Sequence, residues 1–172
     1  MSRRPILFWP DPVLSRRAEE VTAFDADLSA LVAEMFETMY AAPGRGLAAP
    51  QIGVLRRVFV TDATWKDGAR SPRVFVNPTI LRTAGETATG DEGCLSIPGL
   101  LVPVARPLWV EMAWQDPDGR RHEARIEGSE AMIVQHEADH LDGVVTLDRG
   151  GGLAKPPVRP EHEGADHAAP AR

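Results

Sequence analysis

The sequence contains a single cysteine, Cys94, among its 172 residues. A lone cysteine cannot form a disulfide within the chain, so disulfide bonds are not expected to hold this fold together. Long apolar segments are also absent, and no run of about 18 apolar residues suggests a membrane span. The N-terminal segment "MSRRPILFWPDPVL" interrupts its apolar run with two prolines and an aspartate, which is unlike a signal peptide. We therefore expect a cytoplasmic protein without a membrane segment.

Basic residues are outnumbered by acidic ones. The chain has 19 Lys and Arg against 25 Asp and Glu, a formal net charge of -6, and a pI near 5.4. Nucleic-acid-binding domains are usually basic, so no direct nucleic-acid contact is expected. Hydrophobic residues make up 43% of the chain, which is enough for a packed core, and the length suggests one domain.

The last part of the sequence differs in composition from the rest. Residues 150–172 are rich in Gly, Pro and Ala and show no periodicity. Such a segment buries too little apolar surface to offset the entropy of ordering it. We therefore place a catalytic domain at residues 1–149 and expect a disordered tail at residues 150–172.

Two segments carry apolar residues at helical spacing. The first follows Asp25 and Asp27, either of which suits an N-cap, and should end before Pro43. Its apolar stripe consists of Leu28, Leu31, Val32, Met35 and Met39. The second segment, "EGSEAMIVQHEADHLDG", spans residues 127–143, with Ser129 as the candidate N-cap and Gly143 where the helix should end.

Short segments rich in Val and Ile alternate with turn sequences such as "DG" and "DPDG", and these predict strands. The short connections favour antiparallel pairing. The segment "GRGLAAPQIG" (44–53) is rich in Gly and Ala and is expected to be a loop, and "DEGCLSIPG" (91–99) is acidic and rich in turn residues. The predicted strands are 56–62, 73–82, 101–106, 108–115 and 121–127.

The second predicted helix contains the pattern H-E-x-x-H, formed by His136, Glu137 and His140. Residues four apart lie on the same face of a helix, so both histidines can bind one metal ion. Glu137 is one step around the helix and can lie beside the ion without binding it. The alternative is that the histidines only cap or pack the helix. A catalytic metal usually has three protein ligands and one open position, so a third ligand is needed.

The third ligand is not found downstream of the motif. The longer pattern H-E-x-x-H-x-x-G-x-x-H matches as far as Gly143, but Thr146 occupies the final histidine position. Glu161 is at the distance of a downstream glutamate ligand, but the prolines around it exclude a helix. Upstream, Cys94 is the best candidate because a thiolate binds iron or zinc strongly. The alternative for Cys94 is a buried apolar residue.

Three segments together are similar to the signature motifs of the peptide deformylases. They are "GRGLAAPQ" (44–51), "EGCLS" (92–96) and "QHEADH" (135–140), in the same order. The resemblance also includes "DPVL", "ETMYAA", "VNP" and "LDGVVTLDR", and extends over residues 5–149. One H-E-x-x-H is moderately specific, whereas the three motifs in one chain are highly specific.

The resemblance implies an α+β fold in which antiparallel strands pack around a central helix carrying the two histidines. It implies hydrolysis of the N-formyl group from the N-terminal formylmethionine of newly made proteins, with release of formate. The metal would be one divalent ion. Fe²⁺ is the expected ion, and Zn²⁺ or another divalent ion is the alternative. Newly made formylated peptides would be the partners, the ribosome would be contacted transiently at most, and the enzyme would act as a monomer.

The resemblance also implies roles for individual residues. Cys94, His136 and His140 would bind the metal, and Glu137 would transfer the proton of the attacking water. The Gln51 amide and the Leu95 backbone N–H would donate hydrogen bonds to the formyl oxygen. Alternatively, Gln51 is a solvated loop residue.

Several further residues are candidates for contact with the substrate peptide. Gly46 would allow close approach of the peptide backbone, and Met132 and Ile133 would line an apolar pocket. Two positions depart from the family: Arg45 and Gly90 stand where relatives usually carry apolar residues at the methionine pocket. The tail also lacks the basic C-terminal helix of many relatives, which puts ribosome contact through such a helix in doubt.

There are two alternative functions, and the departures at Arg45 and Gly90 motivate the first. One is a metal hydrolase of the same fold that acts on another N-formyl or small amide substrate. The other is a metal-binding module without catalysis. The presence of Glu137 and Gln51 argues against this alternative, because neither residue is needed to hold a metal.

Overall fold

The computed structural model describes residues 3–150, so the tail predicted at 150–172 lies outside the described residues except for Gly150. Its strands form two sheets, and their antiparallel pairing is as predicted. The five-stranded sheet has the order β1-β2-β3-β6-β7, and β4 pairs with β5 in a separate two-stranded sheet. The strands are β1 (Gly46–Ala48), β2 (Val58–Asp62), β3 (Pro72–Thr83), β4 (Thr87–Cys94), β5 (Ile97–Pro107), β6 (Trp109–Gln115) and β7 (Arg121–Glu127).

Both predicted helices are present. The first is α1 (Ala26–Ala41), capped by the Asp25 side chain, which accepts a hydrogen bond from the Leu28 backbone N–H at 3.1 Å. The second is α2 (Gly128–Leu141). Its N-cap is Glu127 without a side-chain cap, so the prediction of Ser129 as N-cap was wrong: Ser129 already lies in the first turn. The shorter helical elements are η1 (Pro12–Ser15), η2 (Ala49–Ile52), η3 (Trp65–Asp67) and α3 (Thr146–Arg149).

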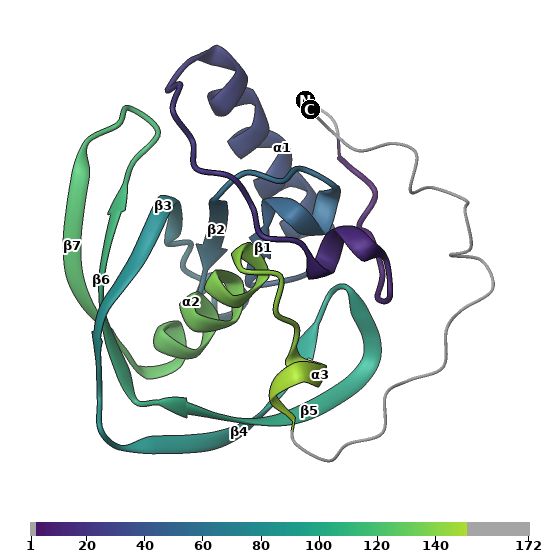
Figure 1. Ribbon diagram of the computed structural model, residues 1–172, viewed down its shortest axis with the longest axis vertical. Helices are drawn as coiled ribbons and strands as arrows, with labels where there is room; N and C mark the ends of the chain where they lie inside the picture. Colours follow the sequence, from purple (N-terminus) through teal and green to yellow (C-terminus); the bar gives the residue numbers. More distant parts are fainter. Residues whose placement is uncertain (1–2, 151–172) are drawn as a thin grey trace.

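Helix α2 occupies the centre of the molecule, with the strands of both sheets curving around it (Figure 1). Its apolar residues Ala131, Val134 and Leu141 are fully buried. They share a core cluster with Phe59 of β2 and Phe75 of β3, whose rings stack with centroids 4.7 Å apart. Packing of this kind supports the helix, because tertiary contacts contribute most of the stability of a helix this short.

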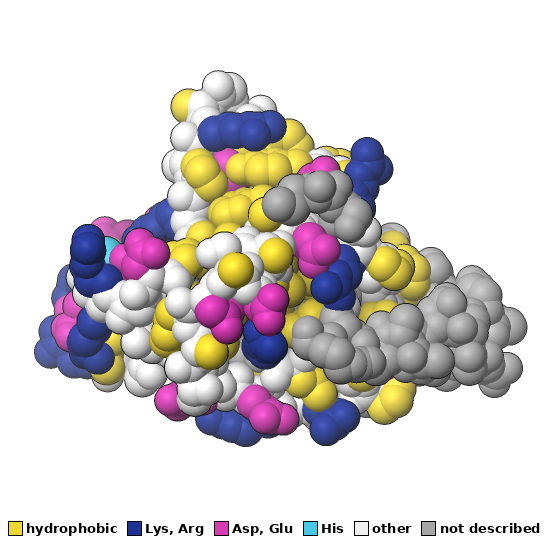
Figure 2. Space-filling model, turned by 90° about the horizontal axis from the view of Figure 1, so that it is seen from above, with side chains coloured by type: hydrophobic (Ala, Val, Ile, Leu, Met, Phe, Trp, Pro, Cys, Tyr) yellow, Lys and Arg dark blue, Asp and Glu magenta, His cyan; other side chains and the backbone are white. Residues whose placement is uncertain are grey.

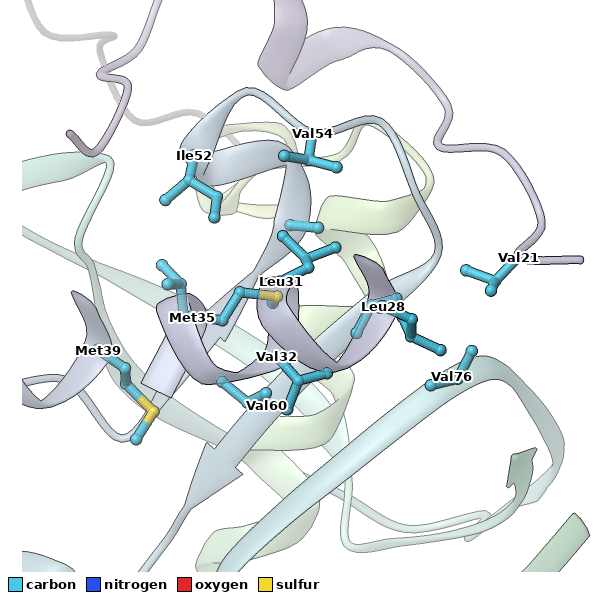
Figure 3. Packing of buried hydrophobic residues seen from close by; sticks show 13 residues of the cluster. Val21, Leu28, Leu31, Val32, Met35, Met39, Ile52, Val54, Val60 and Val76 are labelled. Carbon is cyan, nitrogen blue, oxygen red and sulfur yellow. The ribbon is translucent and has the colours of Figure 1, made fainter. Parts of the chain in front are cut away.

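Helix α1 packs through its predicted apolar stripe. Leu28, Met35 and Met39 are fully buried against residues of η2, β2 and β3. In the view of Figure 3, Ile52 of η2 and Val60 of β2 lie on opposite sides of the helix. This cluster fixes α1 beside the segment that runs through β1 and η2. That segment carries Gly46 and Gln51, so the core positions one wall of the site described below.

The structure corrects one predicted loop and adds one strand. Residues 44–53 contain β1 and η2, and residues 87–94, where no strand was predicted, form β4, which pairs along its length with β5. Most β4 side chains are exposed, so neither apolar alternation nor β-branched composition could reveal the strand. Cys94 ends β4 opposite Ile97, with Leu95 and Ser96 making the turn between the strands.

The surface carries mixed charge. On the face shown in Figure 2, acidic and basic side chains are interspersed among hydrophobic ones. Within residues 3–150, no helix is both long and apolar enough to cross a membrane.

Gly143 provides a test of the connection that follows α2. Its φ is +74°, and an added Cβ would lie 2.7 Å from the carbonyl carbon and oxygen of Ser15. We expect Gly143→Ala to lower the free energy of unfolding by about 2 kcal/mol or more, because backbone strain and a backbone clash add together. Urea denaturation measures this loss.

Gly128→Ala is the matched control. Gly128 has a similar φ of +66°, but no atom lies within 4 Å of its added Cβ. This variant should show only the cost of the left-handed backbone, about 1 kcal/mol. Equal losses in the two variants would contradict the proposed clash with Ser15.

Candidate metal centre and active site

The three predicted metal ligands come together at the centre of the molecule. Cys94 at the end of β4 meets His136 and His140 of α2, and their candidate ligand atoms all lie within 4.8 Å of one another. The Cys94 Sγ is 3.4 Å from the His140 Nε2, a separation that two metal bonds of about 2.0 to 2.3 Å can span. Between 1% and 9% of each residue is exposed, so solvent is largely excluded.

The donor set fits a divalent transition metal. A thiolate and two imidazoles suit iron and zinc, and three protein ligands leave a position open. His136 uses its Nδ1 for a hydrogen bond with Glu92 at 3.0 Å, which leaves its Nε2 as the ligand atom. This carboxylate–histidine pair is the usual way to fix the orientation of a metal-binding imidazole. The site therefore resembles a metal centre in both ligands and support.

The electrostatics around the two histidines differ. Burial, together with the charges of His136 and Arg106, lowers the pKa of His140 well below its usual value. Its ring is therefore neutral, as a metal ligand must be. Burial also lowers the pKa of His136, but contacts with Cys94, Glu137 and Glu92 outweigh it and raise that pKa well above the usual value. His136 therefore favours the protonated state in the absence of a cation.

An ion-pair network that was not predicted from the sequence supports the metal ligands through Glu92, the hydrogen-bond partner of His136. Arg106 of β5 is 3% exposed and contacts Glu92 at 2.5 and 2.9 Å. It also reaches Asp139 of α2 at 3.0 Å. Burial raises the pKa of Glu92, but hydrogen bonds from Arg106 and His136 outweigh it and lower this pKa to about 2. Glu92 is therefore ionised and holds the His136 ring in place.

The signal for this network was present in the sequence. Glu92 lies inside the segment "EGCLS" and Asp139 inside "QHEADH", so two acids accompany the metal ligands. Arg106 ends the predicted strand 101–106. Its position between the two carboxylates depends on the pairing of β4 with β5, and β4 was not predicted.

Glu137 lies beside the three ligands and faces a cavity. It is 5% exposed, and its Oε1 is a buried oxygen without a hydrogen-bond partner among the described residues. Burial is the main reason that its pKa rises to about 7. A carboxyl group in this state can accept and return a proton near neutral pH.

Gln51 is buried rather than solvated, so the loop alternative was wrong. Its Oε1 accepts a hydrogen bond from the Ala48 backbone N–H at 2.9 Å. Its amide nitrogen therefore points the other way, to the Ser96 Oγ at 3.1 Å and the Cys94 Sγ at 3.8 Å. The orientation of the amide is fixed, with its N–H donors beside the metal centre.

A cavity of about 900 Å³ opens onto Glu137, Cys94 and His136. It is lined by most of the residues predicted to contact substrate: Arg45, Gly46, Gln51, Leu95, Met132 and Ile133. An added Cβ at Gly46 would lie 2.6 Å from the Glu137 Oε2 and 3.0 Å from its Cδ and Cγ, so a larger residue there would displace the Glu137 side chain. Gly90 is different: it lies exposed in β4 opposite Val104 and is not part of the cavity wall. The prediction that Gly90 shapes a substrate pocket is therefore not supported.

Comparison with known proteins agrees with this geometry. The family model for polypeptide deformylase matches residues 3–155. The chain belongs to the polypeptide deformylase family. A peptide deformylase of Rhizorhabdus wittichii is 43% identical over 98% of both chains. That of Zymomonas mobilis is 45% identical over 86% of both chains.

Solved structures of peptide deformylases have the same fold. A Synechococcus elongatus peptide deformylase in complex with actinonin has a TM-score of 0.84 at 40% identity, covering 87% of this chain and 81% of that one. The Thermotoga maritima peptide deformylase has a TM-score of 0.81 at 41% identity, covering 86% of this chain and 97% of that one. The predicted α+β fold, with its central H-E-x-x-H helix, is confirmed, and the family is one of metal-dependent hydrolases.

Glu92→Gln tests the support of the metal centre. This change removes the carboxylate charge behind His136 while keeping the size of the side chain. We expect metal affinity, measured by competition with a chelator, to fall by about tenfold or more. Glu111→Gln is the control, because Glu111 pairs with Arg82 and Arg125 on the surface of β6. A Glu92→Gln protein that binds metal as tightly as this control would refute the supporting role.

Proposed function

We propose that this chain removes the formyl group from the N-terminal formylmethionine of newly made proteins by metal-dependent hydrolysis. The observation that carries the proposal is the placement of Glu137. Its free carboxyl oxygen lies buried beside a Cys-His-His cluster, at the wall of a cavity, with fixed amide donors of Gln51 nearby. A site that only held metal would need neither group.

The reaction is hydrolysis of a formamide, in which water adds to the formyl carbon and the C–N bond breaks. Cys94, His136 and His140 would hold the divalent ion, which when bound lowers the pKa of water and polarises a carbonyl group. Glu137 accepts the proton of the attacking water and passes it to the departing nitrogen, giving formate and a free amino terminus. The unligated position of Glu137 leaves its oxygens available for this transfer.

Negative charge develops on the formyl oxygen during the attack. The Gln51 side-chain amide donates a hydrogen bond to this oxygen, and the Leu95 backbone N–H donates a second one. Because Ala48 holds the Gln51 Oε1, the amide nitrogen stays directed at the metal centre, and the formyl oxygen would replace the long contact of this nitrogen with the Cys94 Sγ at 3.8 Å. Removing one such donor typically costs about 2.7 to 4 kcal/mol of barrier.

The substrate peptide would lie extended beside β1. Among residues 3–150, this strand is at the end of the five-stranded sheet and pairs only with β2, so its other edge can accept an added strand. Gly46 allows the peptide to approach Glu137 closely. Met132 and Ile133 provide an apolar wall for the methionine side chain.

The identity of the metal and the cellular setting are part of the proposal. Fe²⁺ is the proposed ion, with Zn²⁺ or another divalent ion as the alternative, since thiolate and imidazole suit both. A cytoplasmic location fits a thiolate ligand, because reducing conditions keep it from oxidation. The enzyme would act as a monomer, with transient contact to the ribosome at most.

A second candidate is a hydrolase of the same fold that acts on another N-formyl or small amide compound. Arg45 at the cavity wall favours this reading, whereas the exposed position of Gly90 removes the other reason for it. Rates of formate release from formyl-Met-Ala-Ser and from small formamides distinguish the two candidate functions.

Glu137→Gln tests the mechanism. Formate release from formyl-Met-Ala-Ser is measured with protein loaded with Fe²⁺ without oxygen. We expect the variant to lose about 10² to 10⁴-fold in turnover, the usual contribution of a general base, while it still binds metal stoichiometrically. Glu130→Gln is the control, since Glu130 lies on the same helix and pairs with Arg73. Full activity in Glu137→Gln would overturn its role, and no release by the wild type would overturn the proposed function.

A further inference from the structure

The wall of the active-site cavity carries two cations that the proposed reaction does not use. Besides His136, its charged residues are Arg45, Lys66, Glu92 and Glu137. The two acids are already engaged or buried: Glu92 pairs with Arg106, and Glu137 is 5% exposed at the reacting end. The charge that remains available to a ligand in the outer part of the cavity is therefore positive.

Arg45 directs its guanidinium to the segment after β2. Its Nη1 donates to the Ala63 carbonyl at 3.2 Å, and its Nη2 lies 3.8 Å from Asp67. Asp67 has 68% of its side chain exposed, so water screens this pair and it neutralises little of the charge. The guanidinium has five N–H donors, and several remain free for another carboxylate.

Lys66 is held close to the same loop by its neighbour Trp65. The Trp65 indole N–H donates to the Gly44 carbonyl at 2.8 Å, and its ring meets Tyr40 edge to face. These contacts tie η3 to the residue before Arg45. Lys66 itself is exposed, forms no ion pair among the described residues, and lies 5.8 Å from the Trp65 ring. Its charge is thus available at a defined place on the rim.

The path of the substrate leads past these cations. A formyl group at Glu137 places the following backbone beside Gly46, because Gly46 is in direct contact with the Glu137 carboxyl group. Arg45 precedes Gly46, and its head group is anchored to Ala63 rather than to the apolar residues of α2. The methionine pocket at Met132 and Ile133 thus stays apolar, and the cations face later residues of the peptide.

We infer that Arg45 and Lys66 select formylated peptides with an acidic side chain at the second or third residue. The inference rests on the proposed deformylase function and adds the class of preferred substrate. Exposed ion pairs are individually weak, so two of them should raise kcat/KM by about threefold to tenfold for an acidic residue over a lysine. The preference should shrink in 0.5 M salt, where screening acts within about 4 Å.

The experiment compares kcat/KM for peptide pairs that differ only in charge: formyl-Met-Asp-Ser against formyl-Met-Lys-Ser, and formyl-Met-Ala-Asp against formyl-Met-Ala-Lys. The quantity of interest is the ratio within each pair. Wild-type protein should favour the acidic member of at least one pair. Arg45→Leu and Lys66→Met should each reduce that ratio, and the double variant should bring it near one. Arg45→Glu combined with Lys66→Met leaves only a negative charge at this place and should invert the ratio.

Arg120→Leu is the matched control, because it removes one positive charge from an exposed position between β6 and β7. Its ratios should equal those of the wild type. Formate release at equal rates within both pairs would overturn the inference and leave the proposed function intact. Faster release from formyl-Asp-Ala-Ser than from formyl-Met-Ala-Ser would overturn it too, by placing the cations at the first residue. No release from any formyl peptide would overturn the proposed function itself.

Discussion

Arg106 joins the two parts of the molecule that must meet for the metal centre to exist. It contacts Glu92 on the strand that carries Cys94, and Asp139 on the helix that carries both histidines. A guanidinium with 3% exposure must be paired, because a buried charge without partners costs several kcal/mol. The pairing therefore fixes the position of the β4–β5 hairpin against α2, and with it the distance between the Cys94 Sγ and the imidazoles.

The central helix is unusual in burying polar groups as well as apolar ones. Gln135, His136, Glu137 and His140 are all buried on α2. Gln135 is satisfied by the Pro107 and Ala131 carbonyls, and His136 by Glu92. In contrast, the His140 Nδ1 and the Glu137 Oε1 have no hydrogen-bond partner among the described residues. Buried polar atoms in this state destabilise a fold, and these two belong to the helix face that forms the candidate site.

Sequence patterns predicted most of the elements because most follow local rules. The α1 stripe, the i to i+4 histidine pair and the Val- and Ile-rich strands each carry their own periodicity. Strand β4 does not: its residues Thr87–Cys94 are mostly exposed and polar, and it is a strand because β5 pairs with it. Ser129 was favoured as an N-cap by its residue type, but the backbone enters α2 two residues earlier.

The site was predictable to the same extent and for the same reason. Cys94, His136 and His140 could be found from residue chemistry and spacing, whereas the Arg106 bridge depends on how two strands pair in space. The substrate pocket gives a second example. In the sequence, Arg45 and Gly90 both depart from the family pattern, but of the two only Arg45 lines the cavity. Arg45 is therefore placed where its side chain can meet a bound peptide, whereas Gly90 lies outside the cavity.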